Sequence, residues 1–112
     1  MILFHGTTRT EFPCHIGLCL CETAETAAHY AGPNGTVYAV TVDEDALDWV
    51  TVPGYDRDTN TAPADRNPAA LAAEHGVEAV WFSDEDPHQR AHDTLRLLTP
   101  AAVAAIVSAV AL

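Results

Sequence analysis

Apolar and polar positions divide the chain into short segments with the periods of strands and helices. Apolar stretches predict strands at residues 2–4, 18–20, 36–42, 78–82 and 94–98. The stretch at 36–42 is apolar or β-branched on both faces. This pattern is typical of a central strand that is covered on both sides.

Residues 23–31 predict a helix whose small residues face the core. Thr23 is a suitable N-cap, and Gly32-Pro33 ends the segment. The spacing i, i+3, i+4, i+7 is occupied by Ala24, Ala27, Ala28 and Ala31. At about 100° per residue, Tyr30 lies on the flank of this stripe and His29 faces away from it.

The remaining segments complete a small α+β domain. A helix is predicted at 67–75, a turn at 84–89 and a final helix at 101–112, whereas 46–50 is ambiguous and 53–67 is a long polar loop. Internal repeats, linkers and a regular βαβ alternation are not apparent, so residues 1–112 are expected to form a single α+β domain.

The charge balance excludes several classes of function. The chain has 16 Asp and Glu against 5 basic residues, for a net charge of −11. All five basic residues are arginine: Arg9, Arg57, Arg66, Arg90 and Arg96. Without lysine there is no Schiff-base lysine and no P-loop lysine. Direct nucleic-acid binding and attachment to an anionic membrane are not expected, because both depend on clustered cations.

Cysteine usage favours free thiols. The three cysteines, Cys14, Cys19 and Cys21, are an odd number without an export signal, so we expect a reduced, cytoplasmic protein. The apolar segment 101–112 is shorter than the ~20 residues that span a bilayer, so no membrane association is expected.

The cysteine and histidine residues near the N-terminus do not have the spacing of a metal site. Together with His15 and His29, the three cysteines place soft ligands close together in the sequence. They contain no Cys-x-x-Cys pair, and Cys19 and Cys21 would share one strand face as small buried residues. We therefore expect no metal.

The segment His5-Gly6-Thr7 is the most informative motif. His5 ends an apolar strand, where a ring nitrogen can reach a ligand hydroxyl, and Gly6 lets the backbone approach a flat ligand. Tyr30, on the later helix, offers an aromatic surface for stacking.

These pieces resemble the diphtheria-toxin-like branch of the ADP-ribosyltransferase superfamily, in particular its small phage, toxin or rifamycin-modifying members. The matching segments are residues 3–7 (LFHGT), 25–31 (ETAAHYA), 35–40 (GTVYAV) and 76–85 (GVEAVWFSDE). The resemblance implies an ADP-ribosyltransferase-like fold, with two small, mostly antiparallel sheets that face each other and short flanking helices.

The resemblance also implies an NAD site, with NAD as a substrate. His5 would bond a ribose hydroxyl, the backbone of Gly6 would pair with the nicotinamide amide, and Tyr30 would stack on the nicotinamide ring. Thr7 completes the motif, and Arg9 would lie near the diphosphate. The reaction cleaves the N-glycosidic bond through an oxocarbenium-like centre, which a carboxylate stabilises.

Several acids could supply that carboxylate. Asp84 aligns best with the small phage members, and Glu85 is next to it. Rifamycin-modifying relatives would instead indicate Asp43 or Asp45, and Asp93 is a further candidate.

The expected function is mono-ADP-ribosylation of a protein or other macromolecular acceptor, as in a toxin or a phage counter-defence (anti-CRISPR) effector. The loop 53–67 is the candidate contact with that target. The alternatives are an NAD glycohydrolase toxin, a catalytically silent binding or inhibitor module, and an enzyme that modifies an antibiotic. A toxin would have a cognate antitoxin as partner. An apolar face on the predicted helix 101–112 would support a homodimer, and burial of that helix explains the pattern equally well.

Overall fold

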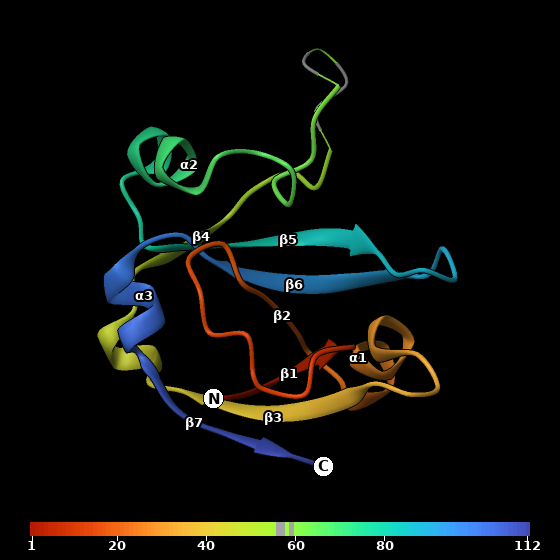
Figure 1. The fold of residues 1–112 in the computed structure, drawn as a ribbon. Helices are drawn as coiled ribbons and strands as arrows, with labels where there is room; N and C mark the ends of the chain where they lie inside the picture. Colours follow the sequence, from red (N-terminus) through yellow and green to blue (C-terminus); the bar gives the residue numbers. More distant parts are fainter. Residues whose placement is uncertain (56–57, 59) are drawn as a thin grey trace.

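Seven strands form one mixed sheet in the computed structural model, which describes residues 1–55, 58 and 60–112 (Figure 1). Their order is β4-β5-β6-β2-β1-β3-β7. The strands are β1 (Ile2–Thr7), β2 (Cys19–Cys21), β3 (Thr36–Val42), β4 (Trp49–Thr51), β5 (Ala79–Glu85), β6 (Ala91–Leu97) and β7 (Ile106–Ala111). Neighbouring strands are antiparallel except β4 and β5, which are parallel.

Helices connect these strands where the sequence provides caps. They are α1 (Ala24–Ala31), α2 (Pro68–His75), α3 (Pro100–Ala104) and the 3₁₀ turn η1 (Glu44–Ala46). Thr23 caps α1 by accepting from the N–H of Thr26, and Asn67 caps α2 by accepting from the N–H of Ala70. The predicted helices 23–31 and 67–75 are therefore confirmed, as is the α+β class.

The sheet bends around β2. This strand pairs with β6 on one side and with β1 on the other, and thereby joins what we expected to be two sheets. In Figure 1, β5 and β6 form an upper layer, β3 and β7 form a lower layer, and β2 crosses between them.

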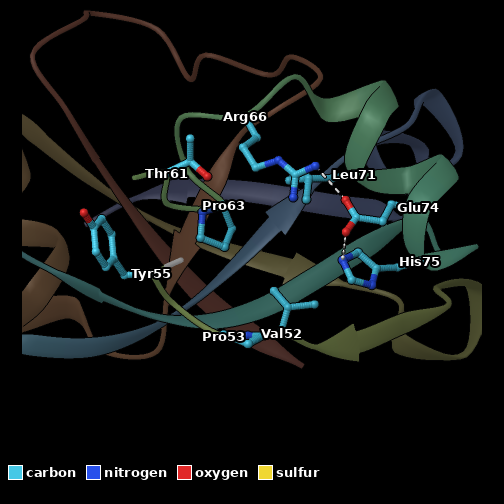
Figure 2. A pocket seen from close by; sticks show the side chains of 9 residues that line it. All are labelled: Val52, Pro53, Tyr55, Thr61, Pro63, Arg66, Leu71, Glu74 and His75. Carbon is cyan, nitrogen blue, oxygen red and sulfur yellow. Dashed lines mark hydrogen bonds and ion pairs between the residues drawn. The ribbon is translucent and has the colours of Figure 1, made fainter. Parts of the chain in front are cut away.

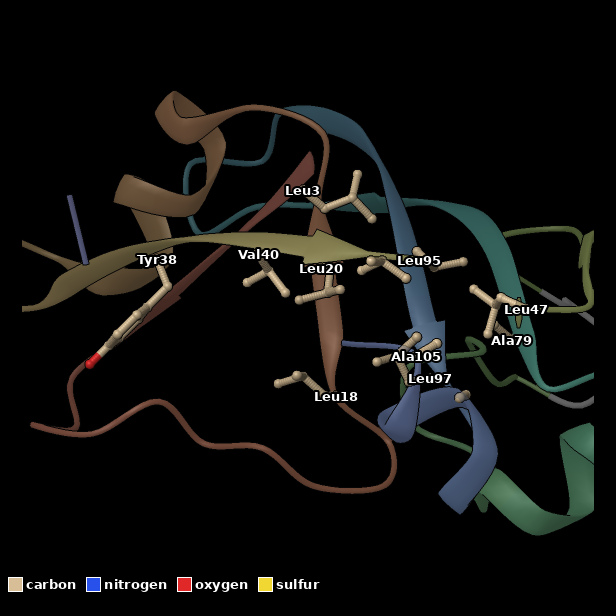
Figure 3. Packing of buried hydrophobic residues seen from close by; sticks show 12 residues of the cluster. Leu3, Leu18, Leu20, Tyr38, Val40, Leu47, Ala79, Leu95, Leu97 and Ala105 are labelled. Atoms are coloured by element: carbon tan, nitrogen blue, oxygen red, sulfur yellow. The ribbon is translucent and has the colours of Figure 1, made fainter. Parts of the chain in front are cut away.

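Two apolar clusters form the core. The larger draws on β1, β2, β3, β6 and α3, and its members include Leu3, Leu20, Val40 and Leu95 (Figure 3). The smaller packs α2 onto the other face of β5, through Leu71, Val80, Phe82 and Leu98. Successive side chains of β5 point to opposite faces of the sheet, so they pack alternately in the two clusters. The side chains at the polar end of β5 likewise alternate between the two faces.

The predicted C-terminal helix is wrong beyond its first turn. Helix α3 ends at Ala104, and Ile106–Ala111 forms β7, which pairs antiparallel with β3. The first half of the segment is alanine-rich, whereas the second half contains the β-branched Ile106, Val107 and Val110. Pairing with the free edge of β3 satisfies the backbone there, and this tertiary contact overrides the weak helical pattern.

The strand that precedes the acidic run is longer than predicted. β5 continues through Asp84 and Glu85, and the turn begins at Asp86. Asp86 closes the turn by accepting from the backbone N–H groups of His88 and Arg90. In the described part of the chain, no helix has the length and apolarity to cross a bilayer.

Candidate functional site

A cavity of about 210 Å³ lies where β1, β2 and α1 meet β5 and β6. Its lining includes four of the residues that the sequence singled out: His5, Gly6, Tyr30 and Asp84. They come from β1, α1 and β5, and the fold brings them together.

His5 presents a neutral ring to this cavity. Its Nδ1 lies 2.8 Å from the carbonyl oxygen of Cys19, which can only accept, so Nδ1 carries the proton. Burial lowers the pKa of His5 below its ordinary value, although the bond to Cys19 opposes the shift. Nε2 is therefore left with a free lone pair, and His5 can accept a hydrogen bond from a ligand hydroxyl.

Gly6 is required for packing of the helix. A Cβ on Gly6 would lie 1.8 Å from the carbonyl oxygen of Ala27 and 2.9 Å from the backbone nitrogen of Ala31. Helix α1 therefore lies directly against β1, and this contact carries Tyr30 to the cavity. The sequence interpretation, in which the missing side chain lets a ligand approach, overlooked this neighbour.

Tyr30 spans the cavity and contacts the opposite strands. Its hydroxyl donates to the carbonyl oxygen of Glu85 at 3.1 Å and lies 2.6 Å from Nε2 of His92. Nδ1 of His92 lies 3.0 Å from the hydroxyl of Thr94. These contacts form a consistent chain if Thr94 donates to His92 Nδ1 and His92 Nε2–H donates to Tyr30. Desolvation and the nearby Asp84 carboxylate raise the pKa of Tyr30 above its ordinary value, so it remains a phenol.

Sequence reasoning did not single out His92. The pairing register would have placed it, because His92 lies opposite Asp84 and Thr94 lies opposite Phe82. Cross-strand partners share a face, so Asp84, His92 and Thr94 point to the same side of the sheet. The sequence alone does not reveal this register.

Asp84 contributes the carboxylate to the cavity, as far as its described lining residues show. It also borders a second cavity of about 480 Å³. Gly54 and Tyr55 of the predicted loop 53–67 line that second cavity. Asp84 therefore stands between a small enclosure and a wider opening beside the loop.

The other candidate acids lie elsewhere among the described residues. Glu85 is exposed and borders only the second of these cavities. Asp93 is exposed, and its carboxyl group is hydrogen-bonded to Glu22. Asp43 caps η1 by accepting from the N–H of Asp45, and neither residue lines the cavity.

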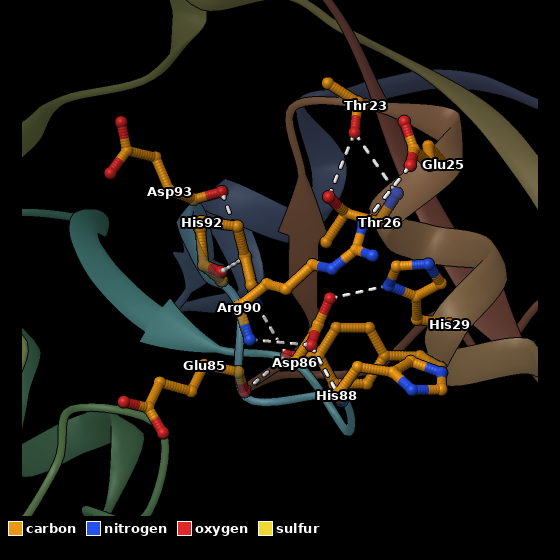
Figure 4. A network of polar contacts seen from close by, with 12 residues as sticks. Thr23, Glu25, Thr26, His29, Glu85, Asp86, His88, Arg90, His92 and Asp93 are labelled. Carbon is orange, nitrogen blue, oxygen red and sulfur yellow. Dashed lines mark hydrogen bonds and ion pairs between the residues drawn. The ribbon is translucent and has the colours of Figure 1, made fainter.

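Asp86 has a structural role at the β5–β6 turn (Figure 4). His29 Nδ1–H donates to its Oδ2 at 2.6 Å. Burial opposes ionisation, but the hydrogen bonds from His29, Arg90 and His88 lower the pKa of Asp86 to about 2. The sequence did not predict a partner for His29, and the β5–β6 turn supplies one by contacting α1 there.

Thr7 and Arg9 lie outside the lining of the cavity. The buried hydroxyl of Thr7 accepts from the backbone N–H of Arg9 at 3.1 Å, which orders the chain as it leaves β1. The Arg66 and Arg90 side chains pair with carboxylates, and that of Arg96 is bonded to backbone carbonyls. Within the described ranges, Arg9 is the arginine whose side chain has no such partner.

Cys19 and Cys21 form part of the cavity wall. Burial raises the pKa of Cys19 to about 11 and that of Cys21 to about 12, so both remain thiols. Cys14 is exposed. The described residues include no group of three or more His, Cys, Asp or Glu side chains that could hold a metal ion.

A third cavity, of about 390 Å³, lies between the loop and α2 (Figure 2). Tyr55 and Pro63 line it from the loop, and Arg66, which precedes α2, forms a 2.6 Å ion pair with Glu74 of α2. Five of its lining residues belong to the predicted target-contact loop 53–67, and none is a candidate NAD-binding or catalytic residue.

No protein-family model, no curated protein and no solved structure matches this chain. The chemistry of the site is therefore argued from its geometry.

Proposed function

We propose that this protein is a mono-ADP-ribosyltransferase that uses NAD as a substrate and transfers ADP-ribose to a macromolecular acceptor. The observation that supports this proposal best is the shared cavity of His5, Gly6, Tyr30 and Asp84. The resemblance of the sequence assigns these residues to one site, and they come from segments far apart in the chain. The β5–β6 and β1–β3–β7 parts of the bent sheet would take the places of the two sheets of that fold.

The cavity has features that fit one end of a dinucleotide. Its volume of about 210 Å³ is smaller than the ~300–1,000 Å³ of pockets that enclose a drug-sized ligand, so it would hold a ring and part of a sugar. The Tyr30 ring supplies an aromatic wall, and Nε2 of His5 accepts from a ribose hydroxyl. Arg9 would then be available to the diphosphate outside the cavity.

Asp84 is the proposed catalytic carboxylate. In the reaction the bond between the ribose carbon and the nicotinamide nitrogen breaks, and nicotinamide leaves with the electron pair. Asp84 would stabilise the positive charge that develops on the ribose. Because the cavity is lined largely by apolar groups and thiols, this interaction is screened less than it would be in water.

The acceptor would approach from the second cavity. Asp84 borders that opening, and residues of the loop beside it, including Tyr55, are positioned to contact a target. A nucleophile there would bond to the ribose carbon on the face opposite the leaving group and release its proton. If water enters instead, the same site hydrolyses NAD.

The test is incubation of the protein with NAD labelled on the adenosine, together with cell lysate. We expect release of nicotinamide and transfer of label to macromolecules. Asp84→Asn should lower the rate by ~10²–10³, as loss of one well-placed electrostatic contact does. The matched control is Asp93→Asn, which removes the same charge from an exposed position on the neighbouring strand.

The outcomes separate the alternatives. Nicotinamide release without labelled macromolecules identifies a glycohydrolase. If calorimetry detects no NAD binding and no nicotinamide is released, the proposal is refuted, and a binding module remains. Equal loss of activity in Asp84→Asn and Asp93→Asn would refute the role of Asp84.

A further inference from the structure

Strand β7 forms an open edge of the sheet. It follows β3 at the end of the strand order, and no described strand pairs with its other side. The N–H of Leu112 donates to the carbonyl oxygen of Val37 at 2.9 Å. Because bonded and non-bonded positions alternate along an antiparallel pair, the backbone groups of Ala109 and Ala111 point away from β3, whereas a register shift beside Val107 interrupts this alternation.

β7 carries no charged side chain and no proline that would block further pairing, although its ladder with β3 has one irregularity, between Thr41 and Val42. Natural edges carry Lys, Pro or inward-pointing charges that block further pairing. Residues 97–112 contain no charged side chain. Val107 is 69% exposed and Val110 is 59% exposed, so the strand presents apolar side chains to solvent.

We propose that β7 pairs antiparallel with β7 of a second copy of this chain, about a two-fold axis at Ala109. In this register Val107 lies opposite the partner's Ala111, and Ala109 lies opposite the partner's Ala109. The outward N–H and C=O of Ala109 then pair with those of the partner's Ala109, and the two sheets become one. Such an isologous contact is self-complementary and closed, so assembly stops at the dimer.

The charge distribution selects β7 over β4 as the edge at which a second copy can pair. Two chains that each carry −11 repel one another wherever their acids meet. β7 is the uncharged edge, whereas β4, at the other end of the sheet, has only three residues. Asp48 immediately precedes β4, and its N–H donates to Glu78 beside it, so two acids stand next to this shorter edge. Pairing through β7 keeps these charges apart.

This inference is independent of the proposed function, because β7 contributes nothing to the lining of the cavity that contains His5 and Asp84. A dimer of this kind leaves the cavity open. Failure of either proposal therefore does not affect the other.

Sedimentation equilibrium of the whole chain from micromolar to millimolar concentration tests the dimer. We expect a monomer–dimer equilibrium that becomes tighter when salt is raised, because salt screens the repulsion between the two copies. Ala109→Pro removes one outward N–H from each copy and should weaken the dimer about tenfold. The N–H of Ala109 is not used in pairing with β3, so that ladder remains.

Val110→Glu is the second variant, with Ile16→Glu as its matched control. Both positions are exposed and apolar, at 59% and 47%, and both variants add one negative charge. Val110→Glu should weaken the dimer, whereas Ile16→Glu should not, with circular dichroism confirming that both are folded. A monomer at all concentrations, equal effects of the two variants, or open-ended fibres would overturn the proposal.

Discussion

Arg96 is a buried cation that holds three backbone carbonyl groups. It is only 7% exposed. Its Nε donates to the carbonyl oxygen of Gly17 at 3.1 Å, and its Nη1 donates to those of Pro63 and Arg66, each at 2.6 Å. Arg96 thus ties the chain before β2 and the end of the long loop to β6.

Replacement of Arg96 by Met keeps much of the side-chain volume and removes all three donors. Hydrogen bonds to charged groups contribute ~1.5–3 kcal/mol each, and a buried carbonyl left without a partner costs ~1–3 kcal/mol. The loop can move and expose the carbonyls of Pro63 and Arg66 to water, so the three losses do not add in full. We therefore expect a decrease in the free energy of unfolding of about 3 kcal/mol.

Urea unfolding followed by tryptophan fluorescence measures this change. The control is Arg66→Met, which breaks only the partly exposed pair with Glu74 and should cost less than about 1 kcal/mol. Cleavage by chymotrypsin at the exposed Tyr55 should also become faster in Arg96→Met. If Arg96→Met is as stable as the native chain, or if Arg66→Met costs as much, the reasoning is refuted.

Three further predictions follow from local contacts. Gly6→Ala should destabilise the fold by at least ~1–3 kcal/mol in urea unfolding, because the new Cβ meets the backbone of α1, and an unchanged midpoint would contradict the packing described. The pKa of Asp86 is lowered to about 2, so its contribution to stability is complete above an unfolded pKa of ~4 and is lost as the pH falls toward 2. Unfolding midpoints measured from pH 5 to 2 should therefore fall less steeply in Asp86→Asn than in the native chain, and parallel curves would refute this. A thiol reagent at pH 8 should modify the exposed Cys14 quickly. It should modify Cys19 and Cys21 only after unfolding, because their pKa values are raised to about 11 and 12. Fast modification of all three cysteines would contradict this and show that the cavity wall is open.

Local signals in the sequence predicted much of the fold. Thr23 and Asn67 cap helices as expected, because capping depends on hydrogen bonds within one turn. The strand 36–42 was placed correctly for a similar reason, since its apolar and β-branched residues form a continuous run. β7 was missed because its pairing with β3 joins segments about 70 residues apart.

In the candidate site, too, the residues marked by local motifs were predicted, whereas those that depend on long-range pairing were not. The resemblance singled out His5, Tyr30 and Asp84, which line one cavity. His92 and Arg96 were missed because their roles depend on strand register and burial, which one sequence does not disclose. The partner of His29 was missed for the same reason. Because His29 bonds to Asp86, His29→Ala should loosen the turn that follows Asp84 and Glu85.

The short strand β2 determines how the molecule can flex. It pairs three residues with β6 and one with β1, so the backbone bonds that cross this seam are few. The amides of such a seam exchange with solvent through small openings, while the longer ladders on either side remain closed. Cys19 and Cys21 stand on the seam and line the cavity. A small rotation of the two halves of the sheet about β2 would therefore widen or narrow the cavity. The strand pairing within each half would change little.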